Sequence, residues 1–197
     1  MTPAQADDAR AASDCSDSLE SNSSTTQEGM RLDSPRLADG AALWRIARDS
    51  RVLDLNSSYS YLLWCRDYAG TSIVARDASG SPVGFVTGYT RPAAPRTLLI
   101  WQVAVDHAQR GRGLAGAMLD ALAARARRRL GVEVVETTVT PDNTASDRLF
   151  TSFALRHQAA VEREVLFDSV VFPEHGHAPE VLYRIGPLGA PVPATGR

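Results

Sequence analysis

The chain has 197 residues and a formal net charge of −2, which is enough for one substantial core plus an appendage. All 21 of its basic residues are arginine, so no lysine is present to form a Schiff base or to serve a phosphate-binding P-loop. The charge balance also argues against a nucleic-acid-binding protein, which normally carries a clustered positive excess. We therefore expect a single active site that acts on small molecules.

The cysteines and the lack of long apolar segments indicate a cytoplasmic protein. Cys15 lies in a low-complexity stretch and Cys65 in an apolar helical pattern, a poor arrangement for a disulfide framework. No stretch reaches the ~20 apolar residues that a membrane helix needs. The N-terminus lacks the basic start and apolar core of a signal peptide. We expect a reducing compartment and no membrane association.

Composition divides the chain into three parts. Residues 1–32 are predicted to be a disordered acidic leader, because they are rich in Ser, Thr and acidic residues and too poor in apolar surface to offset ordering entropy. Residues 189–197 are predicted to be a flexible tail because of their Gly and Pro content. The folded unit is expected over 33–188.

Two helices are predicted at the start of the folded unit. Apolar residues recur at helical spacing over 41–48 and 58–68. Asp39 before the first helix and Asn56 or Ser57 before the second are available as N-caps.

The remaining elements alternate between β-rich runs and one well-marked helix. Turn residues separate three runs that favour an antiparallel meander, at 71–76, 83–90 and 97–105. A helix with one apolar face begins at Leu114. The elements predicted after it are a strand at 132–140, a helix at 143–157 and strands at 161–167 and 180–185. This order describes an α+β domain with a strand–helix–strand crossover at its centre.

A glycine-rich turn, Arg110-Gly111-Arg112-Gly113, joins the strand ending at Val105 to this central helix. Glycines let backbone N–H groups approach a ligand closely, and a helix N-terminus carries about half a positive charge. Together with Arg110 or Arg112, such a turn would hold a pyrophosphate. Taken alone, the motif more often marks an ordinary turn and cap.

Its context favours the binding function. A strand, the pattern R-x-x-G-x-A and an amphipathic helix, followed by a second strand and Asn143-x-Ala145, together resemble the acetyl-CoA site of the GNAT superfamily. The resemblance implies a GNAT-like fold: a mixed central sheet, with an antiparallel meander and a parallel strand pair that splays apart, flanked by helices. The acetyl-CoA-binding residues that it implies are Val103, Val105, Arg110, Gly111, Arg112, Gly113, Leu114, Ala115 and Asn143.

A closer resemblance covers nearly the whole folded unit. The segments that carry it begin at Leu53, Val83, Trp101, Glu136 and Pro179: LDLNSSY, VGFVTGY, WQVAVD, ETTVTPDN and PEVLYRIGPL. They are similar to the L-2,4-diaminobutyrate acetyltransferases of ectoine biosynthesis. This family implies transfer of an acetyl group from acetyl-CoA to the γ-amine of diaminobutyrate, a homodimeric assembly and no metal ion. The N-γ-acetyl product is the compound that ectoine synthase cyclises.

This substrate has two ammonium groups and one carboxylate, so its pocket should offer acids to the amines and donors to the carboxylate. The resemblance implies these substrate-binding residues: Asp54, Asn56, Tyr59, Trp101, Glu136 and one of His175 or His177. Glu136 is also the catalytic candidate, because its carboxylate would bind the ammonium or relay a proton through water.

Each candidate also has a purely structural interpretation. Asp54 and Asn56 would equally serve as caps, Tyr59 and Trp101 as core aromatics, and a strand edge would tolerate Glu136. His-Gly-His at 175–177 is weak evidence for a metal, because no further ligands stand at ligand spacing.

The expected mechanism is direct attack of the amine on the thioester. An alkyl amine with a pKa of about 10.4 is mostly protonated at pH 7, so the enzyme must favour the free base. A backbone N–H on the strand of Val103 and Val105 would hold the oxyanion, without a covalent enzyme intermediate. Many GNAT enzymes have a tyrosine where this chain has Phe150. The departing thiolate would take its proton from another group such as Tyr89, from water, or leave unaided.

Three other functions compete with this interpretation. The chain could acetylate another amine, such as a polyamine, or bind coenzyme A without catalysis. The arginine-rich segment 125–129 could bind nucleic acid, although a solvated face that complements the helix dipole explains it more simply.

Overall fold

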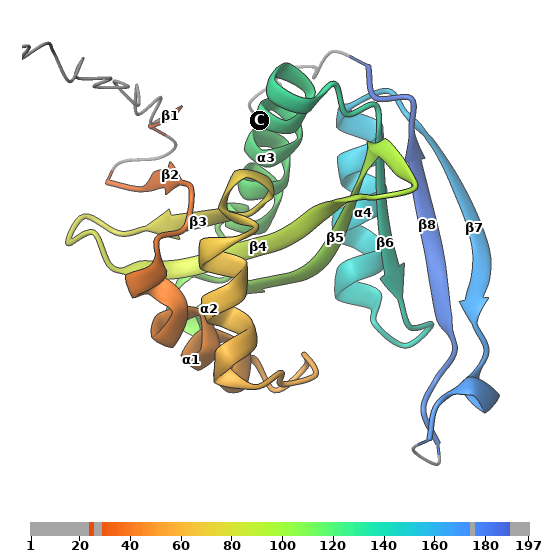
Figure 1. The fold of residues 1–197 in the computed structure, drawn as a ribbon, viewed down its shortest axis with the longest axis horizontal. Helices are drawn as coiled ribbons and strands as arrows, with labels where there is room; N and C mark the ends of the chain where they lie inside the picture. The colour runs from red at the N-terminus through yellow and green to blue at the C-terminus, as the bar shows by residue number, and fades with distance from the viewer. Residues whose placement is uncertain (1–23, 26–28, 174–175, 190–197) are drawn as a thin grey trace, which may run out of the picture.

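In the computed structural model, residues 24–25, 29–173 and 176–189 are described, and within them a mixed sheet is covered by helices on both faces (Figure 1). The strands are β1 Ser24–Thr25, β2 Arg31–Asp33, β3 Ile73–Arg76, β4 Pro82–Arg91, β5 Ala94–Val105, β6 Val134–Val139, β7 Ala160–Phe167 and β8 Glu180–Gly186. The α-helices are α1 Gly40–Ser50, α2 Ser58–Arg66, α3 Leu114–Leu130 and α4 Thr144–Arg156. Short 3-10 helices are η1 Leu37–Asp39, η2 Ala69–Thr71, η3 His107–Gln109 and η4 Ser169–Val171.

The strand order is β1-β2-β3-β4-β5-β6-β8-β7. β3 to β5 form the predicted antiparallel meander, and β2, which the sequence did not predict, extends it by pairing antiparallel with β3. β6 and β7 both pair antiparallel with β8. β5 and β6 are parallel and are joined by α3 as the crossover helix. The predicted α+β fold, with one parallel pair inside a mostly antiparallel sheet, is confirmed.

Two apolar clusters pack on opposite faces of this sheet. Alternation along β3 sends Val74 to one face and Ile73 to the other. Val74 joins Leu43, Ile46 and other residues of α1 and α2, while Ile73 joins the apolar faces of α3 and α4. The helix pairs therefore cover opposite faces, as Figure 1 shows.

Ordered contacts extend beyond both boundaries that the sequence predicts. Met30 and Leu32 are buried in the core, and β2 pairs with β3, so the packed region begins before residue 33. At the other end, the Gly189 N–H donates to the His157 carbonyl over 2.8 Å, and its carbonyl accepts from Arg127. Packing therefore continues through Gly189.

The prediction that Asp39 caps α1 is wrong, and the predicted solvated arginine face is wrong at Arg125 and Arg127, of which Arg127 bonds the Gly189 carbonyl. Asp39 stands at the N-cap of α1, but its carboxylate accepts from Arg76 and from the Arg36 N–H at the start of η1, and it makes no cap bond to α1. Arg125 turns inward from α3 to bond Ser34 Oγ and the Ser72 carbonyl. Burial lowers the pKa of Arg125 to about 10.

None of the helices in the described ranges combines the length and the apolar composition that a membrane-spanning helix needs.

Candidate active site

The site forms where β5 and β6 separate. Their parallel pairing covers only Thr97–Leu99 against Val134–Glu136, whereas β5 continues to Val105 and β6 to Val139. A bulge assists the divergence: Gln102 pairs with Thr87 and Ile100 with Gly88, which leaves Trp101 unmatched on β5. A bulge bends and twists its strand. Two cavities meet at the resulting gap and share Val103 and Asn143 in their walls.

The first cavity has a volume of about 870 Å³ and follows the N-terminus of α3. It contains all but one of the sequence-predicted acetyl-CoA residues: Val103, Val105, Arg110, Gly111, Gly113, Leu114, Ala115 and Asn143. Arg112 does not line it; its Nη1 donates to Gln109 Oε1 over 2.6 Å within the same turn. The motif residues thus converge on one concave surface.

Backbone geometry makes the start of α3 suitable for an anion. Gly111 and Gly113 have φ values of 76° and 71°, a region that side-chain-bearing residues rarely adopt. Gly113 is the N-cap, and no side chain caps the helix. The first N–H groups of a helix have no intrahelical partner, so those after Gly113 can bind phosphate oxygens. This arrangement suits the pyrophosphate of a nucleotide cofactor.

A polar network that the sequence did not reveal supports the same cavity. Arg156, at the end of α4, donates to Asp120 of α3 through Nε over 2.9 Å and Nη2 over 3.1 Å. The buried His157 contacts the same carboxylate through Nε2 at 3.0 Å. Arg156 also lies against Gly116, where a Cβ would stand 3.3 Å from its Nη2. The network therefore fixes a guanidinium beside the first turn of α3.

Asn143 marks the junction of the two cavities. Its Oδ1 accepts from the Ser146 N–H over 3.0 Å and caps α4. This bond leaves the amide NH₂ available for the pantetheine contact that the family resemblance implies. Both the structural and the functional interpretation of Asn143 are compatible with its position.

The second cavity, of about 840 Å³, lies on the other side of the gap. Among the described residues in its wall, the charged side chains are Asp54, Arg91, Glu136, Asp142 and Glu180. Four acids against one permanent cation give this cavity a negative character. Such a wall suits a substrate that carries more positive than negative charge.

Glu136 is the most buried of these acids, with 2% of its area exposed. Its position is the last β6 residue paired with β5, directly before the strands diverge. Oε2 accepts from Arg91 Nη1 over 2.8 Å, and Oε1 accepts from Arg184 Nη1. The sequence predicted this carboxylate at the site but neither guanidinium partner.

The loop before α2 forms one wall of the second cavity. Tyr61 donates its hydroxyl to Gln102 Oε1 over 3.0 Å, and Gln102 Nε2 donates to the Asp54 carbonyl over 2.9 Å. Burial raises the pKa of Tyr61, and hydrogen bonds with Gln102 and Asn56 only partly oppose this. Asp54 and Asn56 line the cavity, and the N-cap of α2 is Ser57, so the purely capping interpretation does not apply to them.

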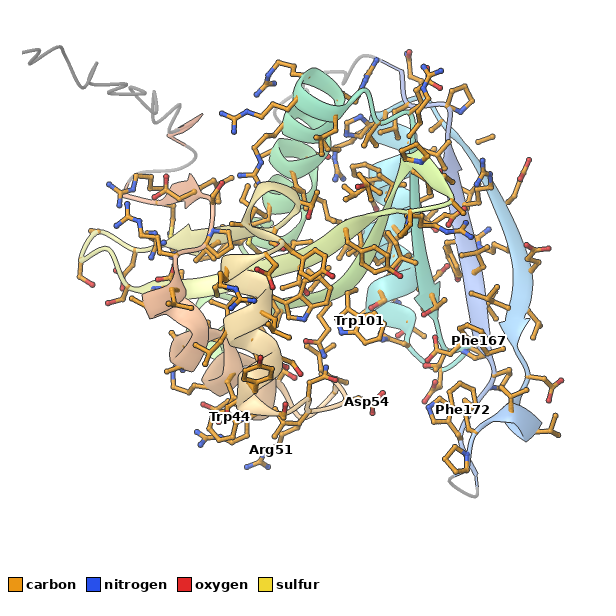
Figure 2. The ribbon with its side chains drawn as sticks, viewed as in Figure 1. Trp44, Arg51, Asp54, Trp101, Phe167 and Phe172 are labelled. Carbon is orange, nitrogen blue, oxygen red and sulfur yellow. The ribbon has the colours of Figure 1, made fainter. Side chains whose placement is uncertain are left out.

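Aromatic residues face this cavity from opposite sides. Figure 2 shows Trp101 and Asp54 on one side of the cavity and Phe167 on the other. Trp101 is 51% exposed and stacks on Trp64 with a ring separation of 6.2 Å, so it is not a core residue. Tyr59 is 64% exposed and is absent from both cavity walls. Its substrate contact stays a prediction.

Of the two histidine candidates, the structure describes only His177. Its Nδ1 lies 2.6 Å from the Ala178 carbonyl, and its ring stacks on Phe172 at 3.7 Å. Because a carbonyl only accepts, Nδ1 carries the proton and Nε2 is the lone-pair nitrogen of the neutral ring. His177 lines the second cavity, and His175 lies outside the described residues. In the described ranges, no group of three His, Cys, Asp or Glu side chains has the geometry of a metal site.

Phe150 and Tyr89 also line this cavity. Phe150 is 3% exposed and brings no hydroxyl to the gap between the strands. Tyr89 is therefore a phenol in the cavity wall that could protonate a leaving group, as the sequence suggested.

The sequence prediction missed several cavity residues. In the sequence, Arg91 follows a predicted strand and precedes a proline, a pattern that is typical of a turn residue. Glu180 begins a strand that the sequence placed correctly, but nothing local shows that it faces a cavity. Both face it in the structure.

Comparisons with known proteins agree with this geometry. The Acetyltransferase (GNAT) family model matches residues 41–154. The L-2,4-diaminobutyric acid acetyltransferase of Streptomyces coelicolor is 68% identical over 83% of this chain and 96% of its own. That of Streptomyces anulatus is 63% identical over 95% of this chain and 99% of its own.

Solved structures give the same result. Diaminobutyrate acetyltransferase EctA from Paenibacillus lautus, in complex with L-2,4-diaminobutyric acid and coenzyme A, is 36% identical, with a TM-score of 0.76 over 83% of this chain and 98% of that one. Ard1 from Thermoplasma volcanium, 20% identical with a TM-score of 0.66 over 83% of this chain and 99% of that one, shares the fold. This chain belongs to the GNAT acetyltransferase family, and within it to the L-2,4-diaminobutyric acid acetyltransferases.

Proposed function

We propose that this protein transfers the acetyl group of acetyl-CoA to the γ-amine of L-2,4-diaminobutyrate, giving N-γ-acetyl-L-2,4-diaminobutyrate for ectoine biosynthesis. The observation that carries the proposal is the pair of cavities that meet where β5 and β6 diverge. One offers helix N–H groups and arginines to a nucleotide, and the other offers acids to a diamine. The thioester would reach the amine through the gap between them.

The first cavity would bind acetyl-CoA by its phosphates and pantetheine. The turn at Arg110–Gly113 would hold the pyrophosphate, with Arg156 adding a fixed positive charge beside it. Val103 and Asn143, which line both cavities, would direct the pantetheine toward the second. Charge-assisted hydrogen bonds of this kind contribute ~1.5 to 3 kcal/mol each.

The second cavity would bind diaminobutyrate by its ammonium groups. Asp54, Glu136 and Glu180 supply carboxylates, and Trp101 supplies an aromatic face for a cation. The reacting amine must lose a proton before it attacks. Nε2 of His177 would act as an acceptor for that proton directly or through water.

Acetyl transfer then follows by direct displacement. The amine nitrogen forms a bond to the thioester carbonyl carbon, and the oxyanion accepts a hydrogen bond from a β5 N–H in the stretch beyond the β6 pairing. Collapse breaks the C–S bond and releases the thiolate of coenzyme A. Tyr89, which lines the second cavity, would donate its proton to the sulfur. The attacking nitrogen gives up its second proton, which leaves the neutral amide and restores the phenol.

Thiol release with a series of amines tests this proposal. We expect diaminobutyrate to be used with kcat/KM at least about a hundredfold above ornithine, lysine and spermidine, because longer amines place the second charge elsewhere. Equal rates would remove the substrate assignment. Cofactor binding without thiol release for any amine would instead support a non-catalytic coenzyme A-binding module.

We also propose a homodimer, as the family resemblance implies, located in the cytoplasm. β7 is the last strand of the sheet, and it exposes Val165, Leu166 and Phe167, followed by Val170 and Val171 in η4. Exposed apolar patches of this kind mark interaction sites. The free, buried Cys65 fits a reducing compartment. Light scattering should give twice the monomer mass, and a Val165→Glu variant should give the monomer mass.

A further inference from the structure

The wall of the substrate cavity offers several acids to the ammonium groups of the substrate but only one described arginine to its carboxylate. Diaminobutyrate carries one carboxylate, and the described part of the wall holds a single arginine, Arg91, among four acids. Arginine binds carboxylates through its planar guanidinium better than any other side chain. Arg91 is thus the natural partner for the substrate carboxylate, although the sequence gave no reason to select it.

Arg91 is already engaged with an acid that the reaction needs. Its Nη1 donates to Glu136 Oε2 over 2.8 Å, and its side chain is 42% exposed at the end of β4. Arg184 holds the other oxygen of Glu136 from β8, and it is not part of the cavity wall. Arg91 can therefore leave Glu136 without stranding a buried, unpaired carboxylate, whose isolation is unfavourable.

We propose that Arg91 selects the substrate by its α-carboxylate through an exchange of ion pairs. An ammonium group of diaminobutyrate takes the place of Arg91 on Glu136 Oε2, and the released guanidinium binds the substrate carboxylate. Arg184 stays on Oε1 and keeps Glu136 in place. Only a substrate that brings both charges completes the exchange.

Simple diamines fail this requirement. A diamine without a carboxylate would separate Arg91 from Glu136 and leave the guanidinium without an anion. This inference rests on the function proposed above and adds to it the group that discriminates amino acids from polyamines. It concerns binding, so it predicts effects on KM more than on kcat.

The test compares diaminobutyrate with 1,3-diaminopropane, which has the same two amines and the same three-carbon spacing but no carboxylate. Thiol release is measured for wild type, Arg91→Gln and Arg91→Lys. The control is Arg96→Gln, in the neighbouring part of the same hairpin: Arg96 is exposed and pairs with Glu133 outside the cavity. KM for acetyl-CoA is measured in each variant to show that the fold and the first cavity are intact.

We expect Arg91→Gln to raise KM for diaminobutyrate by about tenfold to a hundredfold, the range for one hydrogen bond to a charged group. Its kcat/KM for 1,3-diaminopropane should stay unchanged or rise, because Arg91 no longer competes for Glu136. Arg91→Lys should recover part of the loss, and Arg96→Gln should match wild type.

Two results would overturn the assignment. An equal fall for both amines in Arg91→Gln would mean that Arg91 acts only by holding Glu136. No fall in kcat/KM for either amine in Arg91→Gln would mean that another donor binds the carboxylate. If wild type itself releases no thiol with diaminobutyrate, the proposed function fails first, and the exchange fails with it.

Discussion

The two cavities of this enzyme are built in different ways. The first cavity, which we propose for acetyl-CoA, offers main-chain N–H groups and two glycines within a single turn at the start of α3. The second cavity, which we propose for diaminobutyrate, rests on side chains from β4, β5, β6, β7, β8, α4 and three loops, as far apart in sequence as Asp54 and Glu180. A site built from backbone N–H groups comes from consecutive residues and can be located in the sequence. A site built from distant side chains forms only after the sheet has assembled.

The first test of this contrast is Glu136→Ala, which should give the largest effect. We expect kcat/KM for diaminobutyrate to fall by at least about a hundredfold, because truncating one partner of a buried charged pair costs ~2–5 kcal/mol. KM for acetyl-CoA should be unchanged, since Glu136 lines only the second cavity. Thiol-release kinetics with each substrate varied in turn give both numbers.

The variant should remain folded. Arg91 and Arg184 are each more than 40% exposed, so water can solvate both guanidiniums once the carboxylate is gone. Thermal unfolding checks this point. A rate of thiol release with diaminobutyrate equal to that of wild type would show that Glu136 has no role in the site.

The degree to which each cavity could be foreseen follows from the same contrast. Gly113 and the apolar face of α3 locate the turn and its helix from local sequence, because helical periodicity and a glycine before it are visible in a dozen residues. The acetyl-CoA role of this turn entered the prediction through its resemblance to the GNAT superfamily. Asp54 and Trp101 entered the prediction only through resemblance to a family. No spacing along the chain says that they face one cavity.

Long-range pairings account for what the sequence did not reveal. Arg91 and Glu136 are 45 residues apart and meet only because β4, β5 and β6 are neighbours in the sheet. Arg156 meets Asp120 for the same kind of reason, through the packing of α3 against α4. β2 was missed because three residues are too few to show alternation.

The second test addresses the backbone-built cavity with Gly113→Ala. An alanine at φ 71° is strained by ~1–2 kcal/mol and meets no protein atom within 4 Å, so strain is the direct effect. We expect KM for acetyl-CoA to rise by about tenfold, because the free turn can relieve strain of this size by leaving the conformation that binds the phosphates. KM for diaminobutyrate should not change. Initial rates over a range of acetyl-CoA concentrations measure the effect.

Gly131→Ala is the matched control at the other end of the same helix. Gly131 has φ 66°, also with no atom within 4 Å of an added Cβ, and it is not in either cavity wall. Both variants should lose similar stability in thermal unfolding. A rise in KM for acetyl-CoA in both would show that strain in α3 acts indirectly, against a specific role of the turn.

The smallest effect is expected from Tyr61→Phe, because Tyr61 does not line the substrate cavity and contacts it through Gln102. Removing the hydroxyl leaves Gln102 Oε1 without its donor and loosens the bond from Gln102 to the Asp54 carbonyl. We expect KM for diaminobutyrate to rise by about threefold to tenfold, part of the ~1–3 kcal/mol that an unsatisfied buried acceptor costs.

The kinetics with acetyl-CoA should be unchanged in Tyr61→Phe. The control Tyr68→Phe should leave KM for both substrates unchanged, because the half-exposed ring of Tyr68 lies outside both cavity walls. Because burial raises the pKa of Tyr61 from its ordinary value, its hydroxyl remains a donor throughout neutral pH. The KM ratio of variant to wild type should therefore be constant from about pH 7 to 9; a ratio that varied with pH would place the titrating group elsewhere and remove Tyr61 from this role.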